Sequence, residues 1–183
     1  MTRYQTWHFD RTFPSDEQGA LCSRAQELGL VALVESSTEF ACTYVVLEIP
    51  EDGTAGELAA RYPGATIDEG AVIALGIHPQ AQDALPELQH ALEGPGAPGG
   101  VLRAAVRNDA LLLAFDPERT SWMLIKALID AELLRFGSTT RRTTLLSPVT
   151  PHRQAQIAAD GLRCIDIEPA RVLETYANQH VDR

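Results

Sequence analysis

The sequence predicts an α+β protein made of two tandem βαββαβ units of the ferredoxin-like type, followed by a C-terminal helical extension. Short β-favouring runs alternate with amphipathic helical segments in the order βαββαβ, and the same order begins again after residue 70. We expect the units to span 1–69 and 70–147, and the extension 148–183. Since the halves share element order but no residue-by-residue identity, a single continuous α+β domain is the alternative.

In the first half, capping signals and turn residues delimit the elements. Ser15 and Gln18 stand at the spacing of a capping box, as do Thr54 and Glu57, so each pair predicts a helix start. Gly29 is placed to end the first helix in the left-handed conformation. The expected elements are a strand at 4–9, a helix at 15–28, hairpin strands at 30–34 and 40–49, a helix at 54–62 and a weak strand at 65–68.

The second half repeats this order with stronger signals. Asn108 and Asp109 suit a tight hairpin turn, and Thr120 or Ser121 is expected to cap the longest helix. Pro86 fits a helix only in its first turn. The expected elements are a strand at 71–77, a helix at 83–93, strands at 101–106 and 111–115, a helix at 122–136 and a strand at 139–146.

The charge balance disfavours polyanionic partners. The chain has 15 Lys and Arg against 25 Asp and Glu, a net charge of −10, which repels nucleic acid and anionic membranes. A nucleic-acid site on the second unit would need its arginines to share one sheet face, and we rank this hypothesis last. These arginines are Arg103, Arg107, Arg141 and Arg142.

Cysteine usage and the N-terminal residues predict a cytoplasmic protein. Cys22, Cys42 and Cys164 are widely spaced and form no CxxC pair, so neither a zinc site nor a disulfide framework is expected. The N-terminus has no apolar signal-peptide region, and the longest apolar runs fall far short of the ~20 residues that span a membrane.

Sequence motifs predict no catalytic residue and no cofactor. The segment 94–99 matches GxGxxG, but it follows a helix and precedes a strand, the reverse of a dinucleotide-binding loop. Ser121 and Lys126 lie five residues apart on one helix and point to different sides, so they form no nucleophile–base pair. His90 belongs to a solvated polar helix face.

Two histidines suggest a low-ranked site for a ligand or a metal. His8 and His78 each lie near the end of the first strand of their unit, with Asp10 and Asp83 following. Two imidazoles with nearby carboxylates can bind a metal ion or exchange protons near neutral pH. The alternative is that the two histidines are unrelated.

The helix predicted at 122–136 is apolar around most of its circumference, which is unusual for a surface helix. We expect it to be covered by the other half, by the C-terminal helices or by a second protomer. The residues predicted to form an interaction surface are Trp122, Ile125, Ile129 and Leu133. Further apolar residues away from this face are Met123, Leu124, Ala127 and Leu134.

These observations favour a non-catalytic interaction protein, an acidic homodimeric adaptor or chaperone-like module that binds another protein. The alternative is a small-molecule or metal-binding enzyme with a site between the two halves near His8 and His78.

Overall fold

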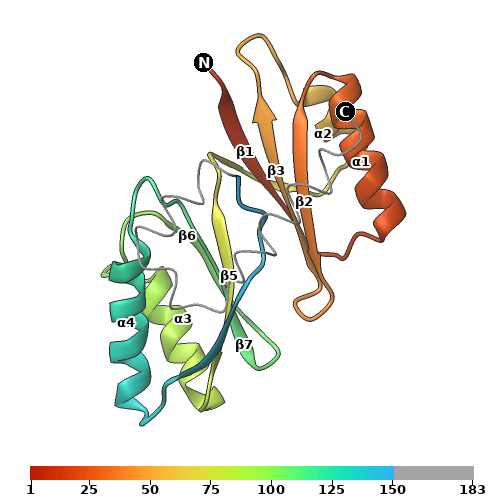
Figure 1. Ribbon diagram of the computed structural model, residues 1–183. Helices are drawn as coiled ribbons and strands as arrows, with labels where there is room; N and C mark the ends of the chain where they lie inside the picture. Colours follow the sequence, from red (N-terminus) through yellow and green to blue (C-terminus); the bar gives the residue numbers. More distant parts are fainter. Residues whose placement is uncertain (151–183) are drawn as a thin grey trace. The chain divides into compact units, whose positions relative to one another are not determined.

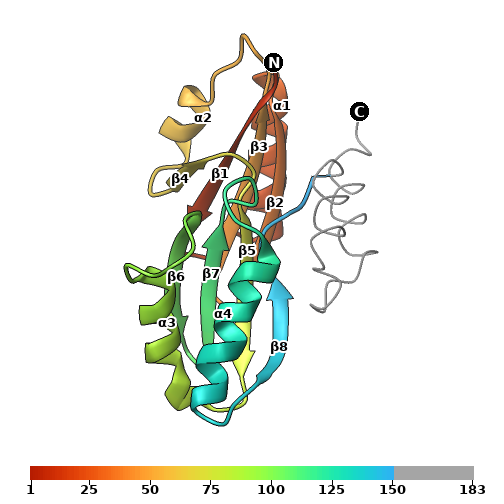
Figure 2. The same cartoon turned by 90° about the vertical axis from the view of Figure 1, so that its left-hand side faces the viewer.

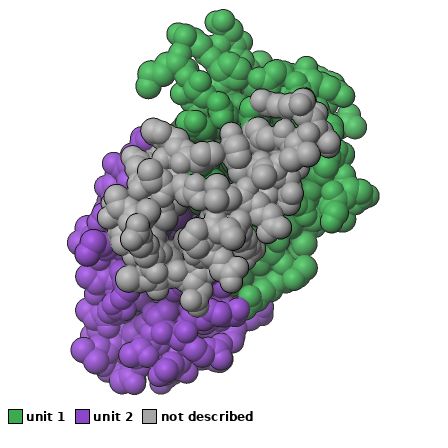
Figure 3. All heavy atoms as spheres, in the orientation of Figure 1, with its two compact units in different colours: residues 1–72, 146–151, 169–183 green, residues 73–145, 152–168 purple. Residues whose placement is uncertain are grey.

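The computed structural model describes residues 1–150, which divide into two compact units. Unit 1 consists of residues 1–72 and 146–150, and unit 2 of residues 73–145 (Figure 3). The expected C-terminal helices, and Cys164 with them, lie outside the described residues from position 151 onward. None of the helices in residues 1–150 has the length and apolar character needed to cross a membrane.

Unit 1 is a four-stranded antiparallel sheet with two helices on one face, in the strand order β2-β3-β1-β4 (Figure 1). This order places the first strand in the centre of the sheet, as in ferredoxin-like folds. Its elements are β1 (Arg3–Phe9), α1 (Ser15–Glu27), β2 (Val31–Ser37), β3 (Cys42–Ile49), α2 (Gly56–Arg61) and β4 (Thr66–Glu69).

Unit 2 repeats the arrangement, with strand order β6-β7-β5-β8 and both helices α3 and α4 on the same face of the sheet (Figure 2). The prediction of two βαββαβ units in an α+β fold is therefore confirmed. The elements are β5 (Ile73–Pro79), a single 3₁₀ turn η1 (Gln82–Ala84), α3 (Leu85–Glu93), β6 (Val101–Arg107), β7 (Ala110–Phe115), α4 (Trp122–Arg135) and β8 (Thr140–Leu145).

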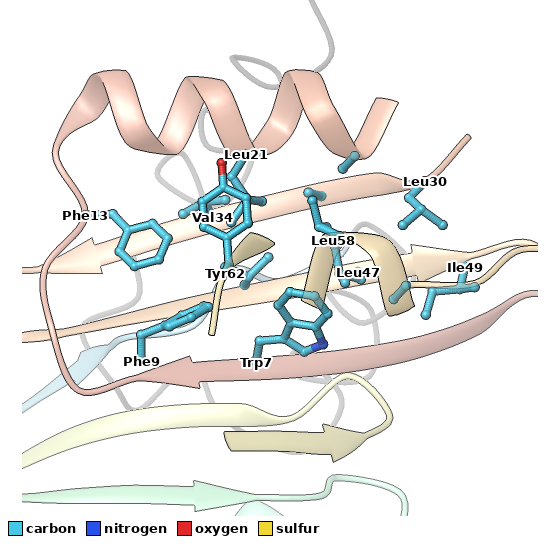
Figure 4. Packing of buried hydrophobic residues seen from close by; sticks show 14 residues of the cluster. Trp7, Phe9, Phe13, Leu21, Leu30, Val34, Leu47, Ile49, Leu58 and Tyr62 are labelled. Atoms are coloured by element: carbon cyan, nitrogen blue, oxygen red, sulfur yellow. The ribbon is translucent and has the colours of Figure 1, made fainter. Parts of the chain in front are cut away.

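The core of unit 1 is rich in aromatic side chains and lies between the sheet and helices α1 and α2 (Figure 4). Alternate residues of β1 point into it, because successive side chains of a strand face opposite sides of the sheet. Trp7 and Phe9 of β1 lie there with Phe13 and Tyr62. The ring centroids of Phe9 and Phe13 are 4.7 Å apart, so aromatic contacts form much of this core.

Helix ends follow the sequence signals in some places, but the predicted capping box at Thr54 is wrong, because Ala55 is the N-cap of α2 and makes no side-chain hydrogen bond. The Ser121 hydroxyl accepts a hydrogen bond from the Leu124 backbone N–H at 3.3 Å, so the predicted N-cap of α4 is confirmed. Gly29 has φ +73° and Gly137 has φ +63°, the left-handed conformation expected just past a helix. The capping box at Ser15 is wrong, because Pro14 takes the N-cap position and Ser15 becomes the first helical residue.

Candidate functional site

His8 and His78 occupy matching positions in the two units. Each is the next-to-last residue of the first strand, β1 or β5. Each points to the sheet face away from the helices, because its neighbour points toward them: Trp7 packs in the unit 1 core, and Ile77 faces α4. Both are buried, with exposed fractions of 5% and 1%. The sequence therefore placed them correctly within their own units.

The His8 ring is held by an aromatic neighbour. It stacks on the Tyr44 ring of the adjacent strand β3, with centroids 4.7 Å apart and an interplanar angle of 21°. Its Nε2 atom lies 3.6 Å from Oδ1 of Asp10, the carboxylate that the sequence predicted. Unit 1 thus combines an imidazole, a phenol ring and a solvent-facing carboxylate.

His78 is held by charged neighbours. Nε2 of His78 lies 3.0 Å from Nη2 of Arg142, its cross-strand partner on β8. A guanidinium only donates hydrogen bonds, so Nε2 must accept and the ring proton sits on Nδ1. That atom lies 3.7 Å from Oδ1 of Asp109. The sequence predicted Asp83 as the nearby carboxylate, but the structure places the turn residue Asp109 there.

Strand register explains this cluster. Ile77 pairs with Leu111, so the β6–β7 turn, with Asn108 at φ 55°, comes alongside the end of β5. On the other side of β5, the register with β8 shifts between His78 and Pro79. The shift leaves Arg141 as an extra residue, and its Nη2 lies 3.8 Å from Oδ2 of Asp109. Sequence reasoning had marked Asp109 only as a turn former.

The Arg142 guanidinium occupies the Nε2 lone pair of His78, so this nitrogen is not available to a metal ion. Within residues 1–150, no group of three or more His, Cys, Asp or Glu side chains is placed to hold a metal ion. The approach of His8 to His78 stays a prediction, since each unit is described by itself.

The four arginines considered for nucleic acid do not form one stripe. Arg103 and Arg107 lie on β6, and Arg141 and Arg142 lie on β8, at opposite edges of the unit 2 sheet. Two strands separate the pairs, so a single strand of nucleic acid would not track all four side chains along one groove.

Helix α4 buries the residues that the sequence predicted as an interaction surface. A side chain with no exposed area contacts no partner, so these residues form core instead, packing inward beneath the outer face of the helix. Their exposed fractions are 3% for Trp122, 0% for Ile125, 1% for Ile129 and 0% for Leu133. The apolar residues that remain accessible are Met123 at 66%, Leu124 at 56% and Leu134 at 73%.

A cavity of about 610 Å³ lies between α4 and the strands β5 and β8 of unit 2. Its wall combines apolar side chains such as Ile77 and Ile129 with charged ones, including Lys126 and Arg141. Trp122 also lines it, and its indole Nε1–H is buried with no hydrogen-bond acceptor in the described part of the chain. No sequence motif pointed to this cavity, because its two walls come from elements without a shared pattern.

Comparison with known proteins finds similar solved structures. No family model and no curated protein matches the sequence. The chain is similar to a crystal structure of an unknown protein from Galdieria sulphuraria, with 11% sequence identity and a TM-score of 0.39. The alignment covers 81% of this chain and 100% of that one.

Proposed function

We propose that this protein is a non-catalytic, homodimeric interaction module that associates through the outer face of α4. The observation that carries the proposal is the exposure of Met123, Leu124 and Leu134 on a helix whose opposite face is already buried. Large exposed apolar side chains gathered on one surface mark interaction sites more often than chance placement does.

Helix geometry gathers these residues into one strip. At roughly 100° per residue, Met123, Ala127 and Leu134 fall within about 40° of one another. Ala131 and Leu124 extend the strip on one side. The strip points away from the buried face, so this helix is apolar on two opposite sides. A surface helix needs only its inward face to be apolar, so the outer strip serves another purpose.

The charges beside the strip suit a second copy of the chain. Lys126 and Asp130 form an ion pair on one flank of α4. In an antiparallel twofold contact, each flank meets the same flank of the copy in reverse order. An axis near position 128 then sets Lys126 of one copy against Asp130 of the other, while small Ala127 near the axis allows close approach. Four alternating charges border the contact.

The length of the helix limits the strength of this dimer. A 14-residue helix is about 21 Å long, so α4 alone buries less than the roughly 800 Å² per partner of a standard interface. We therefore expect a concentration-dependent dimer of moderate affinity.

The direct test is the molar mass in solution across a protein concentration series, measured by sedimentation velocity and light scattering. We expect the wild-type protein to dimerise, and Leu134→Glu or Met123→Glu to weaken the dimer at least about tenfold. Ile67→Glu is the matched control, since Ile67 is an exposed apolar residue of unit 1 and lies on β4. Its dimerisation should equal that of the wild type.

A charge exchange tests the antiparallel geometry separately. Lys126→Asp or Asp130→Lys alone should weaken the dimer by setting like charges against each other, and the double exchange should restore it. A wild type that is monomeric at every concentration contradicts the proposal, as does equal disruption by Ile67→Glu.

A second candidate is a small-molecule or metal-binding enzyme that uses His8 and His78. It is favoured by the two buried imidazoles, each with a carboxylate oxygen within 3.7 Å. Metal analysis of the purified protein, together with ligand binding by His8→Gln and His78→Gln, tests it. Equal loss of binding in both variants supports a shared site, whereas a metal-free protein with unaffected variants excludes it.

A further inference from the structure

The cavity in unit 2 has the size and wall composition of a ligand site. Its volume of about 610 Å³ lies within the range of small-molecule pockets, roughly 300–1,000 Å³. Ile77 and Ile129 give it an apolar side, and Thr139, Thr140 and Thr143 place polar residues at the edge strand. This combination suits a molecule with an apolar body and a polar end.

A buried donor lines this cavity. Trp122 is 3% exposed, and its Nε1–H has no acceptor within residues 1–150. A buried donor without a partner costs free energy unless something else accepts the bond. A ligand oxygen in the cavity would satisfy it. The unpaired indole N–H of Trp122 therefore supports a ligand site independently of the cavity's volume.

Residues of both signs of charge line the cavity, in a protein whose net charge is −10. Lys126, Arg141 and Arg142 line it together with one carboxylate, Asp130. Lys126 pairs with Asp130, and Arg142 is engaged by His78. Arg141 is different: its ion-pair distance to Asp109 is 3.8 Å, too long for a hydrogen bond. Its planar guanidinium can bind a carboxylate or phosphate group through two donors.

We propose that this cavity binds a small organic anion, with the apolar body against Ile77 and Ile129 and the anionic group held by Arg141. The Trp122 indole N–H donates to an oxygen of the same ligand. The site needs no residue of a second copy of the chain, although Lys126, Asp130 and Leu134 line the cavity and also belong to or border the proposed dimer contact.

Binding of defined probes to the full chain, measured by isothermal titration calorimetry, tests this inference. Octanoate and octyl phosphate carry both an apolar body and an anionic group, 1-octanol carries only the body, and inorganic phosphate only the charge. We expect one of the two amphipathic anions to bind at least tenfold more tightly than 1-octanol and inorganic phosphate. The better of the two identifies the anionic group as a carboxylate or a phosphate.

Variants locate the site. Arg141→Ala should weaken binding of the preferred anion at least tenfold, and Trp122→Phe should weaken it several-fold while keeping an aromatic ring in the core. Arg135→Ala is the matched control, because Arg135 pairs with Glu132 on another side of the same helix. Circular dichroism and thermal unfolding check that each variant remains folded. Arg141 is 59% exposed in its side chain, so its removal should leave the fold intact.

Three results would overturn the proposal. Equal binding of 1-octanol and octanoate would mean that the cavity selects no charge. Unchanged binding by Arg141→Ala would mean that Arg141 does not hold the anion, and no binding of either amphipathic anion at millimolar concentration would mean that the cavity is not an anion site.

Discussion

The two units share one topology but differ in the lengths of their elements and in the packing of their cores. In unit 1 the second helix, α2, has 6 residues and the edge strand β4 has 4, whereas in unit 2 the corresponding α4 has 14 and β8 has 6. Unit 1 fills the space under its short helix with aromatic side chains, including Trp7 and Tyr62. Unit 2 uses a longer helix, which leaves a cavity at its edge strand.

This difference shows which features the fold requires. Both units reach the same strand order, so a long second helix is not needed to close a βαββαβ unit. The outer apolar strip of α4 and the cavity beside it are additions to a fold that unit 1 completes without them. The proposed dimer contact and the proposed ligand cavity both involve α4 and depend on features that the two units do not share.

The largest expected effect concerns the two cores. Trp7→Ala should lower the free energy of unfolding by about 3–5 kcal/mol, since it empties the centre of an aromatic cluster. Ile77→Ala, at the matching position of unit 2, should cost about 2–3 kcal/mol, because this side chain already borders a cavity. Urea unfolding followed by circular dichroism measures both. A larger loss for Ile77→Ala would contradict the proposed contrast between the cores.

The next-largest expected effect is a difference in stability between substitutions of the two histidines. His78→Phe removes the acceptor that Arg142 uses, and should cost about 1–3 kcal/mol. His8→Phe keeps a ring against Tyr44, so it should cost about 1 kcal/mol or less. Thermal unfolding of the two variants provides the comparison. Equal losses would show that the charged cluster at His78 contributes no more than the stacked ring at His8.

A smaller effect is expected at the helix starts. Ser121→Ala should destabilise the protein by about 1 kcal/mol, because the hydroxyl caps α4 by accepting from Leu124. Ser15→Ala should change the stability by less than about 0.5 kcal/mol, since Ser15 makes no cap hydrogen bond in α1. The midpoints of urea unfolding measure the difference in stability, provided that the variants share the same dependence of the unfolding free energy on urea concentration. A cost at Ser15 as large as that at Ser121 would mean that the sequence-predicted capping box forms after all.

The smallest expected effect is a pH dependence of the unfolding free energy that arises from an ion pair in unit 1. The hydrogen bond from Arg11 holds the pKa of Glu17 below its ordinary value of 4.5. The stabilisation is therefore present above that value and is lost as the pH falls through the lowered pKa. For this partly exposed pair it amounts to about 0.2–1 kcal/mol.

Substitution isolates this contribution. Glu17→Gln should lower the stability at neutral pH and reduce its fall in acid, while Glu87→Gln in the first turn of α3 is the matched control. Unfolding free energies measured by urea at neutral and acidic pH test the prediction. An unchanged acid dependence in Glu17→Gln would show that the ion pair contributes nothing to stability.

Local signals in the sequence predicted most of the fold. Apolar periodicity located the helices, and Gly29 and Gly137 marked helix ends because only a glycine adopts positive φ there at little cost. The capping box at Ser15 failed because the spacing does not say which residue starts the helix. Pro14, with its fixed φ, took the N-cap position.

The candidate site was predicted less well, since its parts are distant in the chain. The sequence correctly placed His8 and His78 near the ends of their strands and found the excess of apolar surface on the 122–136 helix, whereas the role of the two histidines stays a prediction. It chose the wrong face of that helix, because a helix that is apolar on two sides gives no sign of which side meets the sheet.

The sequence by itself determined the order of the elements, most of their ends and the two apolar sides of α4, because these depend on neighbours within a few residues. Only the tertiary structure decided which side of α4 faces inward, and which carboxylate lies beside His78. It also formed the cavity next to Arg141. Strand register and helix packing set those contacts, and they join residues as much as 64 positions apart.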